Sequence, residues 1–185
     1  MLLVNLWGAP GAGKSTTAAA VFSMLKQRGC RAEIVTEYAK ELVWSGRRDD
    51  LVDQASILGE QNRRQLRLAR SGCVDVAITD SPLPLVVFYR DWGHRLPNLP
   101  ESFARYAMDQ FAAYRNLNYF LRRGPWSFDG GGRIHGEDEA ERIETALLAF
   151  MESHRLPYTL ASPGQTTHEA LVRDVLARLA EPGAP

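Results

Sequence analysis

The chain has 185 residues, enough for one compact α/β domain and too few for two comfortable ones. Its apolar share of 45% and charged share of 24% are those of an ordinary globular protein, and its 22 Lys and Arg residues balance 22 Asp and Glu residues. The zero net charge excludes the bulk positive field of a non-specific nucleic-acid coat, although a local basic patch remains possible.

The expected elements alternate between short apolar strands and helices. In chain order they are strand Leu2–Trp7, helix Lys14–Arg28, strand Ala32–Val35, helix Glu37–Ser45, helix Asp50–Arg70 (capped by Asp49 or Asp50), strand Val74–Thr79, helix Leu85–Tyr89, helix Glu101–Tyr114, strand Asn118–Leu121, helix Glu137–His154, strand Tyr158–Ala161 and helix Thr167–Leu179. This alternation predicts an α/β fold with a parallel sheet covered on both faces, and ligands at the carboxyl ends of the strands.

We expect one domain over residues 1–181 and a tail over 182–185. Residues 124–136 carry four glycines after Pro125 and are expected to form a mobile lid loop. The two cysteines, Cys30 and Cys73, occur in no paired motif, which suits a reducing cytosol. The apolar start Met1–Trp7 lacks the features of a signal peptide, and no apolar run approaches the roughly 20 residues of a membrane span. The expected location is therefore cytoplasmic, with no membrane partner.

The most specific motif follows the first strand and fits G-x-x-x-x-G-K-[ST] at every fixed position. It consists of Gly8, Ala9, Pro10, Gly11, Ala12, Gly13, Lys14 and Ser15. The glycines let backbone N–H groups surround a phosphate, and the helix that starts at Lys14 directs its positive dipole end to the same anion. Lys14 is expected to reach the β- and γ-phosphates of ATP and Ser15 to ligate Mg²⁺, with Thr16 in the same nucleotide site.

Asp80 ends the third strand, where a carboxylate of a P-loop fold faces the Mg²⁺ site. We therefore expect Asp80 to join Ser15 in holding the metal, although an Asp here could simply cap the next turn. The following residue is Ser81, where P-loop motors commonly carry a Glu that activates water. This difference favours transfer to another acceptor over ATP hydrolysis.

Glu37 follows the second strand and should also open on the cleft. A carboxylate there could accept the proton of an attacking hydroxyl, which makes Glu37 a candidate general base. An acidic residue in the first turn of a helix is favoured in any case by the helix dipole. Both interpretations stay open from the sequence, as does the choice between Glu37 and Asp80 as the base.

Three arginines flank the expected lid. Arg122 and Arg123 follow the fourth strand and are candidates for binding the nucleotide, whereas Arg133 lies in the glycine run and is the preferred catalytic candidate. Guanidinium groups on a closing lid would neutralise the charge that develops on the transferring phosphoryl group. The alternative for each of them is a solvated surface arginine.

The long helix carries Arg63, Arg67 and Arg70 at helical spacing, with Arg64 beside them. Such a ridge could contact the phosphates of nucleic acid, although a charge run on a helix is more often a solvated face. Aromatic residues could stack on a base, or could pack in the core instead; these are Tyr38, Trp44, Trp92 and Trp126.

Taken together, the chain resembles the P-loop kinases of the nicotinamide-ribonucleoside-kinase type, which are grouped under an AAA-like ATPase label and are common in bacteriophages. The shared segments are Gly8–Ser15, Glu37–Glu41, Leu58–Gln61, Thr79–Ser81, Asn118–Leu121 and Pro125–Arg133. The resemblance implies a three-layer sandwich with strand order 2-3-1-4-5. It also implies an acceptor pocket between the Glu37 helix, the long helix and the segment after Asp80.

The resulting hypothesis is an ATP- and Mg²⁺-dependent kinase that phosphorylates a hydroxyl of a nucleoside-type acceptor. The group includes phage kinases that act on 5-hydroxymethyluracil in DNA, so the resemblance favours a DNA-borne base, in the host cytoplasm if a phage encodes the protein. The alternatives are a free nucleoside such as nicotinamide riboside, and a partner-driven P-loop ATPase. The sequence leaves open the choice between ATP and GTP and the oligomeric state.

Overall fold

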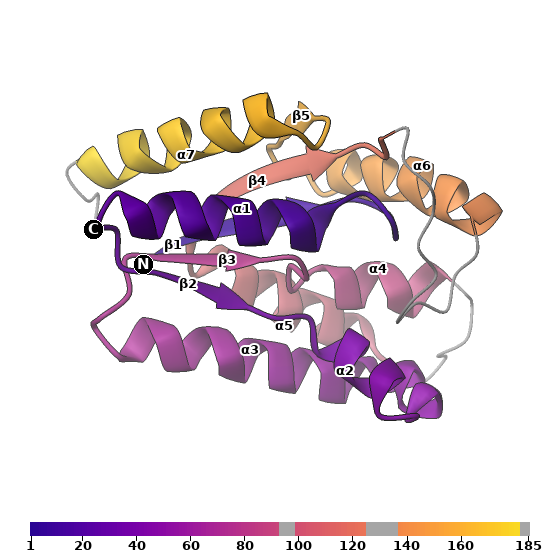
Figure 1. Ribbon diagram of the computed structural model, residues 1–185. Helices are drawn as coiled ribbons and strands as arrows, with labels where there is room; N and C mark the ends of the chain where they lie inside the picture. The colour runs from indigo at the N-terminus through magenta and orange to yellow at the C-terminus, as the bar shows by residue number, and fades with distance from the viewer. Residues whose placement is uncertain (93–98, 125–136, 182–185) are drawn as a thin grey trace.

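The computed structural model describes residues 1–92, 99–124 and 137–181. Its sheet has five parallel strands in the order β2-β3-β1-β4-β5, as expected (Figure 1). The strands are β1 (Leu2–Trp7), β2 (Ala32–Val35), β3 (Val76–Thr79), β4 (Arg115–Leu121) and β5 (Thr159–Ala161). Trp126, Arg133, the tail 182–185 and all of the expected lid except Gly124 lie outside the described residues.

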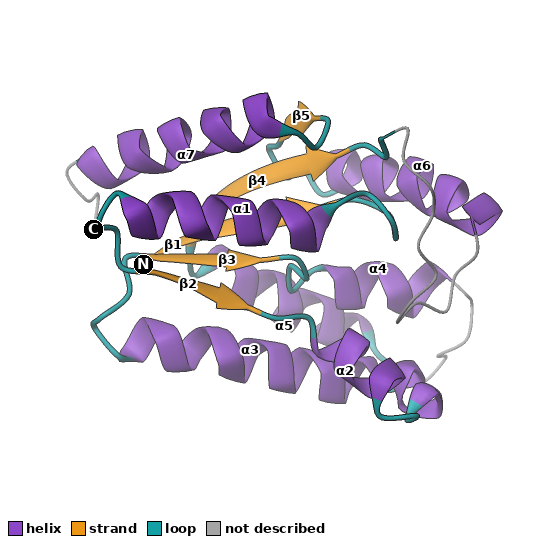
Figure 2. Cartoon of the chain, in the orientation of Figure 1, coloured by secondary structure: helices purple, strands orange, loops and turns teal. Residues whose placement is uncertain are grey.

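Helices cover both faces of this sheet and form the outer layers of a three-layer sandwich (Figure 2). They are α1 (Lys14–Gln27), α2 (Tyr38–Trp44), the 3₁₀ helix η1 (Arg48–Val52), α3 (Gln54–Arg70), α4 (Leu85–Trp92), α5 (Glu101–Ala112), α6 (Glu137–Ser153) and α7 (Gln165–Ala180). Helices α1 and α7 lie on one face, and α3, α4, α5 and α6 lie on the other. No helix in the described ranges is long and apolar enough to cross a membrane.

The strands build a separate apolar core on each face, because alternate side chains of a strand point to opposite sides. On β1, Leu2, Val4 and Leu6 pack with the side chains of α1 and α7. Trp7 belongs to the core on the other face, where α3 to α6 pack. All six residues of β1 are buried, as is usual for a central parallel strand, so this strand holds the loop that follows it on a rigid support.

The expected helix Asp50–Arg70 is wrong at its start, because the chain forms η1 first and begins α3 only at Gln54. Asp53 is the cap, and its side chain accepts a hydrogen bond of 3.0 Å from the backbone N–H of Ser56. The expected cap Asp50 instead accepts a hydrogen bond of 2.7 Å from the Nε of Arg47. A cap is chosen by local geometry among several neighbouring Asp residues, which composition alone does not distinguish.

The fourth strand is longer than the apolar run Asn118–Leu121 predicts. It begins at Arg115, which lies opposite Leu2 of β1 in the parallel register. Backbone pairing with a buried neighbour thus extends the strand through polar residues that carry no strand signal of their own. The helix before it ends at Ala112 rather than at the expected Tyr114.

Candidate active site

The loop between β1 and α1 depends on glycine at its two ends. Gly8 has φ = 139°, and a Cβ atom there would lie 2.5 Å from the carbonyl oxygen of Leu121. Gly13 is the N-cap of α1 in the left-handed region, with φ = 79°, and has no side chain to occupy the N–H groups of the first turn. No capping side chain therefore competes with an anion for the N–H groups at this helix start, and such a helix N-terminus is suited to bind phosphate.

Two polar side chains of the first turn of α1 point back into the loop or across to β3. The Lys14 Nζ donates hydrogen bonds of 2.7 Å to the carbonyl oxygen of Gly8 and 3.0 Å to that of Ala9. The Ser15 hydroxyl donates a hydrogen bond of 2.6 Å to the Oδ2 of Asp80, which ends β3. The structure thus brings Asp80 to the start of α1, although Ser15 and Asp80 are 65 residues apart in sequence.

Asp80 meets the requirements of a metal ligand. Its side chain is buried, and its Oδ1 has no hydrogen-bond partner among the described residues. A buried carboxylate oxygen without a partner is costly unless a cation or water satisfies it. Mg²⁺ prefers hard oxygen ligands and keeps several waters, so the Ser15 hydroxyl and the Asp80 carboxylate fit this ion.

Glu37 lies in the same cavity as Ser15 and Asp80, a hollow of about 250 Å³ between α1, α2 and the end of β2. It is the N-cap of α2, and its side chain makes no hydrogen bond to the N–H groups of that helix. Its position at the start of α2 also agrees with the alternative expected from the sequence, an acidic residue favoured by the helix dipole. The cavity is thus lined by the Glu37 carboxylate as well as by the two residues suited to hold a metal.

Tyr89 of α4 is a buried neighbour of Glu37 that the sequence did not single out. Burial raises the pKa of its phenol above the usual range, and the nearby charges of Glu37 and Glu139 raise it further. The neutral phenol is therefore a hydrogen-bond donor within electrostatic reach of Glu37 at neutral pH. Only its place in an aromatic and Pro-rich segment marked it in the sequence.

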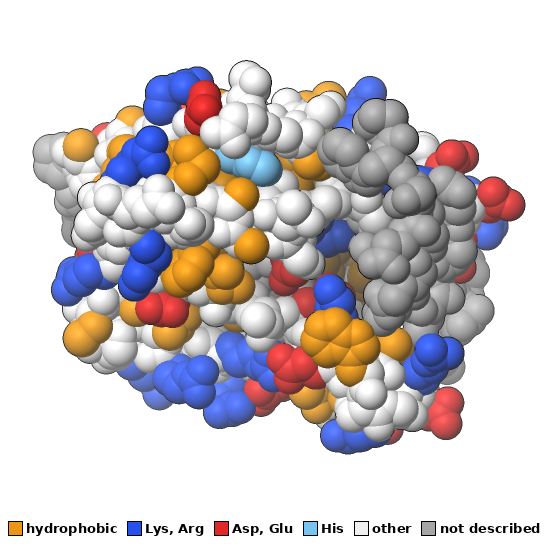
Figure 3. Space-filling view, viewed as in Figure 1, with side chains coloured by type: hydrophobic (Ala, Val, Ile, Leu, Met, Phe, Trp, Pro, Cys, Tyr) orange, Lys and Arg blue, Asp and Glu red, His pale blue; other side chains and the backbone are white. Residues whose placement is uncertain are grey.

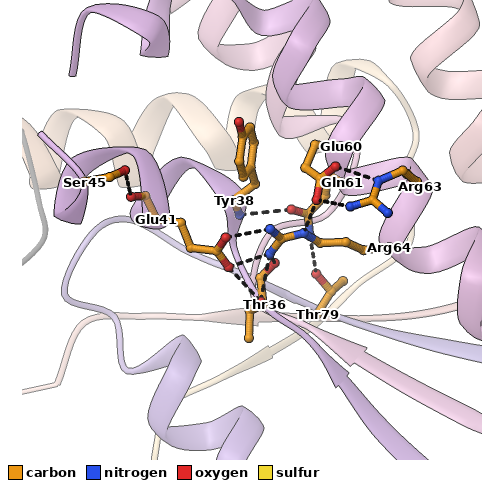
Figure 4. Close-up of polar contacts among 9 residues, drawn as sticks. All are labelled: Thr36, Tyr38, Glu41, Ser45, Glu60, Gln61, Arg63, Arg64 and Thr79. Atoms are coloured by element: carbon orange, nitrogen blue, oxygen red, sulfur yellow. Dashed lines mark hydrogen bonds and ion pairs between the residues drawn. The ribbon is translucent and has the colours of Figure 1, made fainter. Parts of the chain in front are cut away.

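Arg64 of α3 holds α2 in position beside the cavity (Figure 4). Its guanidinium forms two hydrogen bonds of 2.6 Å to the carboxylate of Glu41 and one of 2.9 Å to Glu60. It also donates to the backbone carbonyl and the hydroxyl of Thr36, at 3.2 and 2.9 Å. One side chain therefore joins α3, α2 and the end of β2, directly beside Glu37.

A second connection runs through Gln61, one turn of α3 earlier. Its Oε1 accepts a hydrogen bond of 3.2 Å from the backbone N–H of Tyr38, the first residue of α2. Its Nε2 donates to the hydroxyl of Thr79 at 3.4 Å, and Thr79 directly precedes Asp80 (Figure 4). Gln61 thus links the helix start beside Glu37 to the strand end that carries Asp80.

Comparison with known proteins places the chain in a family. A family model described as an AAA domain matches residues 3–169. The chain belongs to this AAA domain family. No curated protein sequence matches it.

Two solved kinase structures share the fold of this AAA domain. The deoxyadenosine kinase of M. mycoides with bound dATP has a TM-score of 0.55 and 17% identity, over 96% of this chain and 100% of that one. The thymidylate kinase of Ehrlichia chaffeensis has a TM-score of 0.61 and 11% identity, over 96% of this chain and 98% of that one. The fold of the AAA domain is therefore that of the P-loop nucleoside and nucleotide kinases.

The other predicted nucleotide-binding residues lie at the same end of the AAA domain. Thr16 is exposed on the first turn of α1, and Arg122 is exposed at the end of β4. The backbone N–H of Arg123 donates a hydrogen bond of 3.1 Å to the carboxylate of Glu144 in α6. This bond fixes the chain just before Gly124, the first residue of the expected lid.

The predicted arginine ridge does not border the cavity. Arg67 and Arg70 line a separate open groove of about 620 Å³ between α3 and α5, with the exposed Tyr106. Arg63 pairs with Glu60 at 2.7 Å, and basic side chains gather over α3 in Figure 3. Because α3 ends at Arg70 shortly before β3 begins, the Arg70 end of this groove lies near the amino end of β3, whereas Asp80 follows its carboxyl end.

The candidate stacking residues of the AAA domain have different surroundings. Trp92 stacks on Phe88, with ring centroids 5.4 Å apart, and the Tyr38 ring lies 5.3 Å from the Arg64 guanidinium carbon. Among the described members of this set, Trp44 is the one that is strongly exposed, at 68%, and it lines the cavity that contains Glu37. Core packing therefore accounts for part of this aromatic set, and Trp44 is the exception.

Proposed function

We propose that this protein is a kinase that transfers the γ-phosphate of Mg²⁺-bound ATP to a hydroxyl of a nucleoside-type acceptor. The observation that carries the proposal is that Glu37 lines the same cavity as the hydrogen-bonded Ser15–Asp80 pair, beside the P-loop. A phosphate held by the loop and a hydroxyl beside Glu37 would meet there. Phosphoryl transfer depends mainly on such positioning and on charge stabilisation.

The P-loop residues have distinct roles in this proposal. The phosphates would lie in the loop and helix start formed by Gly8, Ala9, Pro10, Gly11, Ala12, Gly13, Lys14, Ser15 and Thr16, and would accept hydrogen bonds from backbone N–H groups of this segment. Pro10 belongs to the loop but has no N–H to donate. Lys14 exchanges its two loop carbonyl partners for the β- and γ-phosphates. Ser15 and Asp80 would hold Mg²⁺, which would supply positive charge to the phosphate oxygens.

Glu37 is the proposed general base. Its carboxylate accepts the proton of the acceptor hydroxyl as that oxygen attacks the γ-phosphorus. Asp80 is less suited to this role, because one of its oxygens already accepts from Ser15 and the other fits the metal. Arg122, Arg123 and Arg133 are proposed to stabilise the transferring phosphoryl group, with Arg133 as the catalytic one.

The source of the acceptor separates two versions of the proposal. The family resemblance favours 5-hydroxymethyluracil within phage DNA, where arginines of α3 would contact phosphates. A free nucleoside gains support from the arginines' position, since Arg67 and Arg70 line a groove that shares no residue with the reaction cavity. A DNA-borne base would also have to leave its stack to reach the cavity.

A partner-driven ATPase is the second candidate, and the AAA domain match supports it. Water activation would then require a carboxylate near the γ-phosphate. Ser81 occupies the position after the β3 Asp and is buried, with its backbone N–H bonded to the hydroxyl of Thr79 at 3.1 Å. This position therefore offers no carboxylate to activate water.

The test is transfer of labelled γ-phosphate from ATP to a panel of acceptors. The panel contains duplex DNA with 5-hydroxymethyluracil, unmodified duplex DNA, nicotinamide riboside and the common nucleosides, with an acceptor-free reaction alongside. Label on the modified DNA alone supports the DNA-base kinase, and label on a free nucleoside supports the nucleoside kinase. Hydrolysis at one rate with every acceptor, without labelled product, would reject the kinase and favour the ATPase.

A further inference from the structure

Trp44 is the most exposed large hydrophobic side chain in the described part of the chain, at 68%. Leaving so much aromatic surface in water forgoes the free energy that burial would contribute. Its one described ring contact is with the Lys40 Nζ, which lies 5.0 Å from the ring centroid. Core packing does not explain this residue.

Trp44 lies on the same side of α2 as the proposed base. Glu37, Lys40, Glu41 and Trp44 follow the three- and four-residue spacing of one helix face, and all four line the 250 Å³ cavity. Seven residues separate Glu37 from Trp44, which places them ~10 Å apart along the helix axis at 1.5 Å per residue. In Figure 3 a hollow opens between the surfaces over α1 and α2, with hydrophobic and charged side chains along its rim.

The cavity therefore has two chemically different ends. Its reactive end holds Ser15, Glu37 and Asp80, whereas its other lining residues include the apolar side chains of Ala18, Ile34 and Trp44. A molecule that presents a hydroxyl to the first end and a flat ring to the second would satisfy both. Stacking of a base on an exposed aromatic ring is a common source of affinity for nucleosides.

The charges of the cavity disfavour a phosphate on the acceptor. Among the described lining residues, Glu37, Glu41 and Asp80 are acidic, and Lys40 is the one basic residue. Arg64 neutralises Glu41 through its two short hydrogen bonds. The bound donor brings further negative charge, so a second phosphate group in this cavity would meet net repulsion.

We infer that Trp44 is the stacking platform of an acceptor subsite, and that this subsite takes an uncharged nucleoside in preference to a nucleoside monophosphate. The inference rests on the proposed kinase function for its reactive end. The base lies against Trp44 and the sugar spans Lys40 and Glu41. The hydroxyl reaches Glu37.

The test measures binding, so that it does not depend on turnover. Deoxyadenosine, thymidine and 5-hydroxymethyldeoxyuridine are compared with their 5′-monophosphates by equilibrium dialysis, with Mg²⁺ and a non-hydrolysable ATP analogue present. We expect saturable binding of at least one nucleoside, on the order of tenfold tighter than its monophosphate. Trp44→Ala should weaken that binding on the order of tenfold, and Trp44→Phe should retain most of it.

Tyr106→Ala is the matched control, because Tyr106 is also an exposed aromatic (52%) but lines the groove between α3 and α5. It should leave nucleoside binding unchanged. Tighter binding of the monophosphates, especially if Lys40→Gln abolished it, would overturn the inference, as would unchanged binding by Trp44→Ala or no saturable binding of any of these compounds. Phosphoryl transfer with Trp44-independent binding would reject the subsite and keep the kinase. Trp44-dependent binding without any transfer would keep the subsite and reject the kinase.

Discussion

Arg64→Met tests whether the contacts around α2 support the reaction. The substitution keeps an unbranched apolar stem of similar reach and removes the guanidinium. The lost partners are the carboxylates of Glu41 and Glu60 and the two oxygens of Thr36. The Arg64 side chain is only 15% exposed, so in the variant its former partners lose their hydrogen bonds and gain only partial hydration in return.

The expected loss of unfolding free energy is about 2 kcal/mol. A hydrogen bond to a charged group contributes about 1.5–3 kcal/mol. The contributions of the individual bonds of Arg64 are not additive, because the Glu41 side chain is 42% exposed and regains hydrogen bonds to water when the guanidinium is removed. For a domain of this size, about 2 kcal/mol corresponds to a Tm lower by about 4–8 °C. Urea unfolding followed by circular dichroism measures the first quantity, and thermal unfolding measures the second.

Arg63→Met is the matched control, because Arg63 also binds Glu60 but its side chain is 63% exposed. Solvent screens an exposed ion pair, so Arg63→Met should lower the Tm by less than Arg64→Met does. Arg64→Met should also lower kcat more than it raises the KM for ATP, since Thr36 adjoins Glu37 and not the P-loop, and Arg64→Lys should restore part of kcat. Equal stability losses in the two Met variants, or an unchanged kcat in Arg64→Met, would refute the positioning role.

Three further predictions concern the P-loop, the base and acid stability. Lys14→Ala should abolish phosphoryl transfer while the circular dichroism spectrum and Tm stay close to those of the wild type, and normal turnover would exclude the P-loop from the reaction. Glu37→Gln should lower kcat by about 10²–10⁴-fold with little change in ATP affinity measured by calorimetry, as expected for a lost general base; a kcat within about twofold of the wild type would leave Asp80 as the base candidate. Hydrogen bonds from Arg63 and, to a smaller extent, from Arg64 hold the pKa of Glu60 at about 2, against an ordinary value of 4.5. The ionised Glu60 carboxylate therefore stabilises the fold fully above pH 4.5, and this stabilisation is lost as the pH falls toward 2. Glu60→Gln should therefore show a flatter decline of unfolding free energy than the wild type in that window, and parallel curves would contradict this assignment.

The sequence predicted the P-loop because its chemistry is local. Gly8 and Gly13 adopt backbone conformations that favour glycine, and Lys14 and Ser15 follow within the same few residues. The strands were also predictable, since a buried parallel strand is a short apolar run. The order of the strands came from the family resemblance and was confirmed by the pairing of β1 with both β3 and β4.

The residues that surround Glu37 were harder to predict, because their contacts join distant parts of the chain. In the sequence Arg64 is one of several arginines on a helix face, but in the structure it points inward and bonds to Thr36, 28 residues earlier. Trp44 is one of four aromatic candidates for stacking in the sequence, which does not reveal that this one stays exposed while lining the cavity. Spacing on one helix does not reveal which neighbouring helix will supply a partner, so such networks require the tertiary structure.

The most direct test of the central claim is the rate of ADP formation by the wild type at saturating Mg²⁺-ATP, with and without the acceptor panel. The account predicts a low rate without acceptor and a rate at least tenfold higher with one hydroxyl-bearing nucleoside or modified DNA, together with one mole of phosphorylated product per mole of ADP. A rate that no acceptor changes, with inorganic phosphate as the only product, would contradict it.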